Sequence, residues 1–154
     1  MTIGVISDTH GLLRDEAVES LKDSELILHA GDVGDPLILD RLGAIAPTIA
    51  VRGNVDTAPW AQSLPLTEVV EAGSLQLYML HELSHLDLDP KAAGFAAVIY
   101  GHTHRPAAEV RNGVLYLNPG SAGPRRFSLP IAVAKLRVVG TRLMQEIVEL
   151  KVDA

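Results

Sequence analysis

Short apolar runs recur along the chain, and several of them end just before a polar side chain. A short apolar run bounded by turn residues is typical of a buried β-strand. Five such runs predict strands at residues 3–6, 26–28, 49–51, 75–80 and 98–100. Between the first three strands, residues 14–22 and 36–42 place apolar side chains on one helical face, which predicts two helices.

The second half of the chain predicts hairpins. Paired strands are expected at 67–71 and 75–80, at 107–111 and 114–117, and at 132–138 and 143–150. Asn112-Gly113 lies between the second pair, and Asn-Gly at that place is a strong signal for a type I′ turn. Residues 86–94 are polar on one side and predict a short helix, with Pro90 limiting its length.

The order of these elements predicts an α/β fold. Strand, helix, strand, helix and strand in the first half favour a parallel sheet with crossover helices. The chain has 154 residues, which suits one domain with its own core. Because no repeat and no linker interrupts it, we expect a single domain spanning 1–154.

Composition and charge narrow the class of protein. The chain is 47% hydrophobic and 21% charged, which indicates a globular protein. No apolar run reaches the roughly 18 residues of a membrane span, and no signal peptide is recognisable. A net charge of −6, with Arg125-Arg126 as the one basic doublet, argues against long nucleic acid as a partner. We expect a cytoplasmic protein with no membrane contact, and the sequence leaves a homo-oligomer open.

Seven side chains that bind metals follow the five predicted strands. They are Asp8, His10, Asp32, Asn54, His81, His102 and His104. In open α/β sheets, ligands bind at the carboxyl ends of strands. One metal takes four to six ligands, so seven candidates suit two divalent ions, with Asp32 as the natural bridge. Nitrogen and oxygen ligands suit Mn, Fe, Zn, Co or Ni, and cysteine is absent. Manganese is the first expectation.

The charge balance of such a site indicates an anionic substrate. Two divalent cations bring four positive charges, of which Asp8, Asp32 and a bridging hydroxide remove three. Two metals about 3.5–4 Å apart activate a shared water and stabilise the attacking and leaving oxygens of an in-line displacement. We therefore expect hydrolysis of a small phosphoester, most simply a phosphodiester, by a metal-bridging hydroxide that attacks phosphorus.

The ordered motifs resemble those of the calcineurin-like metallophosphoesterases. The set comprises Asp-x-His, Gly-Asp, Gly-Asn-x-Asp, a lone His and Gly-His-x-His, and the length is similar to that of the small YfcE-type phosphodiesterases. The resemblance implies a four-layer αββα sandwich of two mixed β-sheets. It also implies one metal on Asp8, His10, Asp32 and His104, and another on Asp32, Asn54, His81 and His102. Asp32, Asn54 and His102 would act in catalysis, and Asn54 and Arg52 would contact substrate.

Two positions depart from the pattern of this family. Val55 stands where many relatives carry a histidine that is thought to protonate the leaving group. Glu82-Leu83 follows His81 where Gly-His is usual, so that loop is expected to run differently. The other two histidines, His29 and His85, are interpreted as structural.

A second class of function stays open, a non-catalytic scaffold or binding module on the same fold. The retromer subunit of this superfamily resembles such a scaffold, with an eroded metal site. A scaffold need not keep all seven ligand types. Because this chain keeps them, the sequence favours the enzyme.

Overall fold

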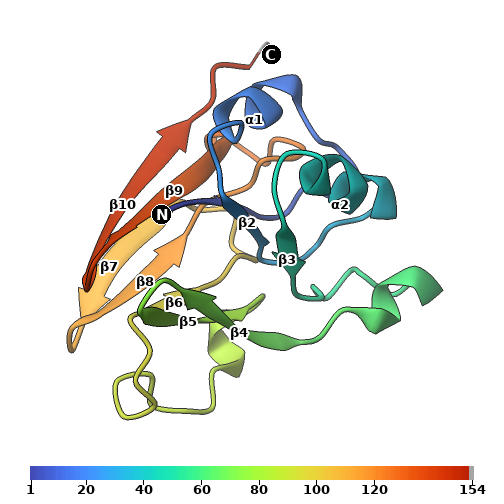
Figure 1. Cartoon of the computed structure of the whole chain (residues 1–154). Coiled ribbons are helices and arrows are strands. Elements are labelled where there is room, and N and C mark those ends of the chain that lie inside the picture. The colour runs from blue at the N-terminus through green and yellow to red at the C-terminus, as the bar shows by residue number, and fades with distance from the viewer. Residues whose placement is uncertain (153–154) are drawn as a thin grey trace.

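The computed structural model describes residues 1–152, in which ten strands form two five-stranded sheets (Figure 1). Sheet I has the strand order β10-β9-β1-β2-β3. Its strands are β1 (Thr2–Ile6), β2 (Leu26–His29), β3 (Thr48–Ala50), β9 (Ala132–Val139) and β10 (Arg142–Glu149). Sheet II has the order β4-β5-β6-β8-β7. Its strands are β4 (Thr67–Ala72), β5 (Leu75–Leu80), β6 (Ala97–Ile99), β7 (Ala107–Arg111) and β8 (Val114–Asn118).

Each sheet contains both parallel and antiparallel strand pairs, as expected for two mixed sheets. In sheet I, β2 pairs in parallel with β1 and β3, and the β9–β10 hairpin adds antiparallel strands. In sheet II, β6 pairs in parallel with β5 and β8, and β4 and β7 lie antiparallel at the edges. Asn112 and Gly113 have φ of 50° and 78°, the positive values that a type I′ turn requires, so the predicted hairpin is confirmed.

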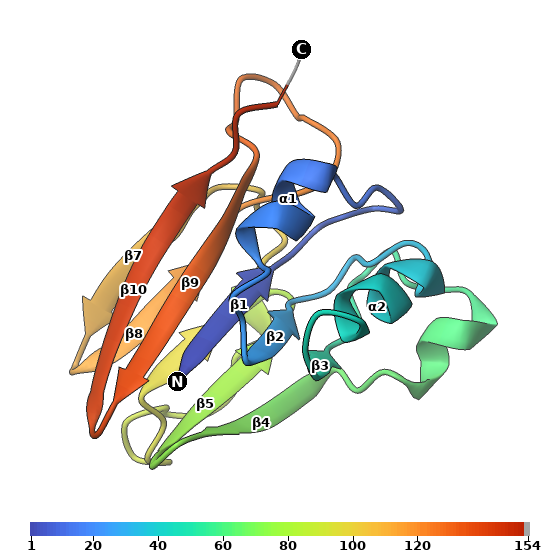
Figure 2. The same ribbon diagram turned by 45° about the horizontal axis from the view of Figure 1, so that its top comes forward.

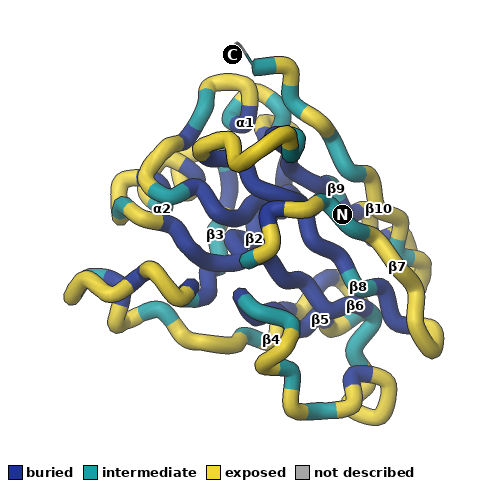
Figure 3. The backbone as a smooth tube through the Cα atoms, turned by 180° about the vertical axis from the view of Figure 1, so that it is seen from behind, coloured by how far each residue is buried: buried dark blue, intermediate teal, exposed yellow. Residues whose placement is uncertain are grey.

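The main core lies between the two sheets. Alternate residues of β1 and β5, such as Ile3, Val5, Leu77 and Met79, are fully buried there. Helices α1 (Asp15–Ser20) and α2 (Pro36–Gly43) lie together beside β1, β2 and β3 (Figure 2). They form a second apolar cluster with the other face of sheet I. The strands near the middle of the molecule are therefore buried, while turns and loops carry most of the exposed backbone (Figure 3).

The outer face of sheet II is covered by irregular chain. A third apolar cluster joins Tyr78 and Leu80 of β5 to side chains of the segment 83–95, which contains the 3₁₀ turn η2 (Leu83–His85). The predicted helix at 86–94 is wrong, because this segment forms turns. Asp89 accepts hydrogen bonds from the two N–H groups after Pro90, and Gly94 has φ of 84°, which ends the turn. The fourth layer is thus a 3₁₀ turn and a loop.

The stretch 57–65 holds one more 3₁₀ turn, η1 (Pro59–Ser63). Among residues 1–152, no helix combines the length and the apolar character needed to cross a membrane.

Candidate metal centre

The loops that carry the predicted ligands continue the pairing of the strands before them. Beyond β1 and β2, the N–H of Ala30 donates to the Ile6 carbonyl at 2.9 Å. The N–H groups of Asp8 and His10 then donate to the carbonyls of Gly31 (3.0 Å) and Asp32 (2.9 Å). In sheet II, the N–H of Gly101 donates to the carbonyl of His81 at 2.9 Å. These backbone hydrogen bonds therefore fix the distances between the Cα atoms that carry the predicted ligands.

Most of the predicted ligands have an unusual backbone conformation. Seven non-glycine residues of the described chain have positive φ, and five of them are Asp8 (56°), His10 (47°), Asp32 (57°), His102 (76°) and His104 (64°). A side chain in this left-handed region costs about 1–2 kcal/mol. Strain of this kind persists where the surrounding structure imposes it, and it concentrates at functional sites.

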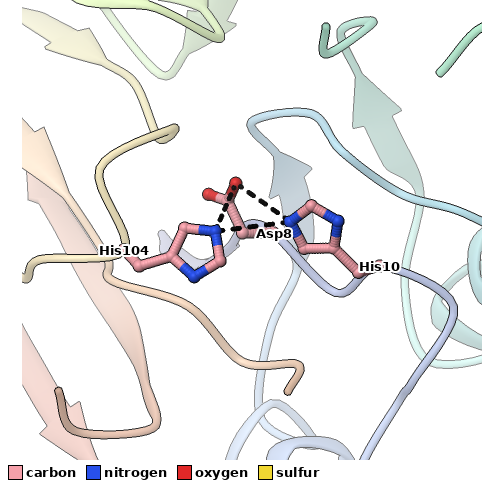
Figure 4. A group of neighbouring side chains, drawn as sticks. All are labelled: Asp8, His10 and His104. Atoms are coloured by element: carbon pink, nitrogen blue, oxygen red, sulfur yellow. Dashed lines mark hydrogen bonds and ion pairs between the residues drawn. The ribbon is translucent and has the colours of Figure 1, made fainter. Parts of the chain in front are cut away.

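Asp8, His10 and His104 form the first ligand group (Figure 4). Asp8 Oδ1 lies 3.7 Å from His10 Nε2 and 3.3 Å from His104 Nε2, and the two Nε2 atoms are 3.3 Å apart. Asp8 Oδ1 is buried and has no hydrogen-bond partner within residues 1–152. Atoms that share an ion at about 2.0–2.2 Å lie roughly 3.0–3.6 Å apart. The two contacts of His104 fall in this range and the contact between Asp8 and His10 is 0.1 Å longer, so the three atoms are spaced nearly as a common cation would require.

Asp32, His81 and His102 form the second ligand group, and Asn54 lies between its two histidines. Asn54 Oδ1 is 3.1 Å from His81 Nε2 and 3.2 Å from His102 Nδ1. His81 Nδ1 donates to the Ala30 carbonyl at 2.7 Å, which leaves Nε2 to face the other ligands. His81 thus lies with this group although the chain after it departs from the family pattern.

Asp32 connects the two ligand groups. Its Oδ2 lies 3.1 Å from His81 Nε2 and 3.7 Å from His10 Nε2. Its Oδ1 accepts the backbone N–H of Val55 at 3.0 Å. One carboxylate therefore faces a histidine of each group, which is the geometry expected of a bridging ligand.

The charges of the site favour ionised carboxylates. Burial opposes ionisation of Asp8, but the neighbouring rings of His10 and His104 and the hydrogen bond from Ser7 outweigh it and hold the pKa of Asp8 well below the usual range. Burial likewise opposes ionisation of Asp32, and the hydrogen bond from His81 still lowers the pKa of Asp32. Burial also acts against the charged form of His81, yet its pKa is raised by the hydrogen bond to Asp32 and by the neighbouring carboxylates. A cation bound there would take the place of that proton.

Glu82 holds the ring of His102, a contact that sequence reasoning missed. Glu82 Oε1 lies 3.0 Å from His102 Nε2, and its Oε2 lies 2.8 Å from His85 Nε2. An N–H donated from Nε2 to the carboxylate turns the lone pair of Nδ1 toward Asn54. The departure from the family pattern at this position was the available signal, but its meaning depended on the path of the loop.

Two buried side chains, His29 and Asp56, hydrogen-bond to the loops that carry the ligands. His29 is fully buried, and the Gly31 N–H donates to its Nδ1 at 3.1 Å, so its Nε2 donates to Thr9 Oγ1 at 3.0 Å. Asp56 accepts three backbone N–H groups, from Val33, Gly34 and Gly53, at 2.9–3.2 Å. These contacts tie the loops after β1, β2 and β3 to one another, and the interpretation of His29 as structural agrees with them.

Glycine is required where the loops approach the carboxylates. A Cβ at Gly53 would collide with the side chain of Asp32, and one at Gly101 would collide with Ser7 and lie 2.7 Å from Asp8 Oδ2. Gly53 is therefore needed because Asp32 packs against it, and Gly101 because Ser7 and Asp8 do.

Arg52 and Val55 flank Asn54 at the edge of the site. Arg52 is partly buried, and its Nη1 donates to Gln62 Oε1 at 2.6 Å. It lines a cavity together with Asn54 and His81. Val55 is 46% exposed, so an apolar side chain lies at this edge of the site.

Comparisons with known proteins relate the chain to one superfamily of phosphoesterases. The model of the calcineurin-like phosphoesterase superfamily domain matches residues 1–140. A probable metallophosphoesterase from Methanothermobacter thermautotrophicus is 34% identical over 163 aligned positions, covering 96% of this chain and 92% of that protein.

Two solved structures have the same fold. An archaeal phosphodiesterase aligns with a TM-score of 0.79 and 26% identity, covering 96% of this chain and 100% of that one. Vps29 from Chaetomium thermophilum aligns with a TM-score of 0.85 and 23% identity, covering 99% and 90%. The second likeness shows the fold alone.

Proposed function

The chain belongs to the calcineurin-like phosphoesterase superfamily and is a metal-dependent phosphoesterase, and we propose that it hydrolyses a small phosphodiester with two divalent cations. One observation carries the proposal. Two groups of metal-binding side chains lie side by side, and a single carboxylate, that of Asp32, faces a histidine of each. Manganese is the ion proposed first, and the cytoplasmic location expected from the sequence stays a prediction.

Each proposed ligand would have a definite task. Asp8, His10 and His104 would hold one cation, His81, His102 and Asn54 the other, and Asp32 both. Bound cations of this kind lower the pKa of a bound water and withdraw charge from phosphoryl oxygens.

The amide of Asn54 is exposed at the mouth of the site, where its Nδ2 would donate to a phosphoryl oxygen. Arg52, beside it, would neutralise the remaining charge. Both side chains would therefore orient the phosphoester for attack.

The residue next to Asn54 cannot protonate the leaving group. Val55 cannot donate a proton, and its backbone N–H is already bonded to Asp32. Esters whose alcohol has a low pKa should therefore react much faster than alkyl esters. This selectivity supports an activated aryl diester as the first substrate to test.

The test is manganese-dependent release of nitrophenol from bis-p-nitrophenyl phosphate. Asp32→Ala and His104→Ala are expected to lower kcat/KM at least about 100-fold, because each removes a ligand. Asp40→Ala, which changes an exposed carboxylate of α2, is the matched control and should retain full activity. Circular dichroism of each variant separates loss of the ligand from loss of the fold.

A non-catalytic scaffold on the same fold is the competing function that the sequence leaves open, and the likeness to Vps29 shows that the fold is shared. The two functions differ in what the full ligand set does. If wild-type protein loaded with manganese, zinc, cobalt or nickel releases no nitrophenol, the scaffold is the better account. Turnover that disappears in Asp32→Ala and persists in Asp40→Ala supports the enzyme.

A further inference from the structure

A cavity of about 440 Å³ opens directly beside the second ligand group. Asn54 and His81 belong to both, so a phosphoester bound at the cations would have the cavity next to one of its ester oxygens. Ligand pockets in proteins are roughly 300–1,000 Å³, far more than a phosphate needs. The cavity is therefore large enough for an organic group attached to the phosphate.

The cavity wall is apolar on one side. Leu80 and Tyr78 reach it from the outer face of β5, and both are almost fully buried at 2% and 7% exposure. Leu66, just before β4, is 61% exposed at the same cavity. A flat ring placed against this wall would shield Leu66 and lie beside the Tyr78 ring.

The charged groups of the cavity do not favour an additional anion. Glu82 and Asp87 bring two carboxylates against the single guanidinium of Arg52. Arg52 donates to Gln62, and Glu82 faces two histidines. A second phosphate placed here would meet more negative than positive charge.

We propose that this cavity is the subsite for the organic group of the phosphoester, and that it takes an uncharged, ring-bearing group. The proposal rests on the proposed function and names the substrate class of the same site. It assigns specificity to Leu66, Thr67 and Tyr78, none of which is a proposed metal ligand.

Binding of phosphonates to the manganese-loaded protein tests the subsite without turnover. Phenylphosphonate and methylphosphonate share the group that would bind the cations and differ in the ring. By calorimetry, phenylphosphonate is expected to bind about tenfold more tightly, the gain from shielding roughly 60 Å² of ring surface. A carboxylate on the ring, in 4-carboxyphenylphosphonate, should remove most of that gain because Glu82 and Asp87 face it.

Two tryptophan variants locate the ring. Thr67→Trp fills the cavity and should bring the affinity ratio of the two phosphonates to about one while methylphosphonate binds as before. Val69→Trp, on the same strand but outside the cavity, should keep the tenfold ratio. Leu66→Ala is a milder change to the same wall and should reduce the ratio severalfold if Thr67→Trp does not fold.

Three results would overturn the inference while the phosphoesterase stands. These are equal affinity of both phosphonates in the wild type, an unchanged ratio in both cavity variants, and tighter binding of the carboxylated ring. Absence of binding by either phosphonate, together with no hydrolysis, would refute the proposed phosphoester site itself and the subsite with it.

Discussion

Asp56 is the residue whose removal should most clearly weaken the frame of the site. Its carboxylate is 3% exposed and accepts the backbone N–H groups of Val33 and Gly53 at Oδ2 and of Gly34 at Oδ1. Val33 follows Asp32, and Gly53 precedes Asn54. A single side chain therefore holds together the two loops that carry these ligands, without being a ligand itself.

The magnitude follows from counting these bonds. Asp56→Ala leaves two fully buried N–H donors unpaired, those of Val33 and Gly53, and a third that is partly buried. An unsatisfied buried donor costs about 1–3 kcal/mol, so the free energy of unfolding should fall by about 3–5 kcal/mol. Asp56→Asn keeps the shape and one acceptor oxygen but turns an N–H₂ toward a donor, and it should cost roughly half as much.

Urea unfolding of the metal-free protein, followed by circular dichroism, measures the effect. With a slope of about 2 kcal/mol/M, the midpoint of Asp56→Ala should lie roughly 2 M below that of the wild type, with Asp56→Asn between them. Asp40→Ala, an exposed carboxylate on α2, should leave the midpoint within about 0.3 M. A midpoint for Asp56→Ala within about 0.5 M of the wild type, at equal slope, would refute the reasoning.

Three further predictions concern the metal and pH. Glu82→Ala frees the His102 ring and should weaken manganese binding about 10–100-fold by calorimetry, with Glu82→Gln closer to wild type because its amide oxygen still accepts. The protein in manganese at about 100 times Kd should have a Tm about 5–10 °C above that of the protein dialysed against a chelator. Adding manganese back should restore the higher Tm. Burial lowers the pKa of His29 from 6.5 to about 4. The unfolded chain therefore binds a proton first, and this residue should cost up to about 3 kcal/mol of stability as pH falls from 6.5 toward 4. His29→Gln should flatten that part of the stability–pH curve, and an unchanged slope would contradict the burial argument.

Local signals were enough to predict most of the fold. Asn112-Gly113 fixes its hairpin because both residues accept positive φ, and the alternation in β9 predicts which face enters the core. The prediction of a helix at 86–94 was wrong because the spacing of the side chains is helical but the backbone cannot form a helix. Pro90 lacks an N–H, and Gly94 adopts positive φ, so only a turn forms.

Part of the candidate site could likewise be predicted from the sequence, and part could not. Within each sheet, the meeting of the ligands could be predicted because parallel strands end at one edge and each polar residue follows a strand end. That the two sheets bring their ligands to one place was implied by the resemblance to the family. The contacts made by Glu82 and Asp56 could not, since they depend on where a loop returns after leaving the sheet. The cavity is the extreme case, as Leu66, Tyr78 and Arg52 come from separate segments and no local pattern relates them.

The backbone of the ligands explains why such a site needs so much support. Asp8, His10 and Asp32 sit in the left-handed region, where short peptides would not hold them. Ladder hydrogen bonds between the loops impose that conformation, and Gly53 allows the close approach that it requires. The carboxylates are thereby held ionised and close together before any cation arrives, with Asp8 Oδ1 buried and unpartnered among the described residues. The rings of His10 and His104 lie within 3.7 Å of this oxygen and balance part of its charge, and a divalent ion bound among them would balance it more fully. The left-handed backbone of these ligands therefore lowers the stability of the free protein, and in return it holds the ligands in the geometry that a pair of cations would complete.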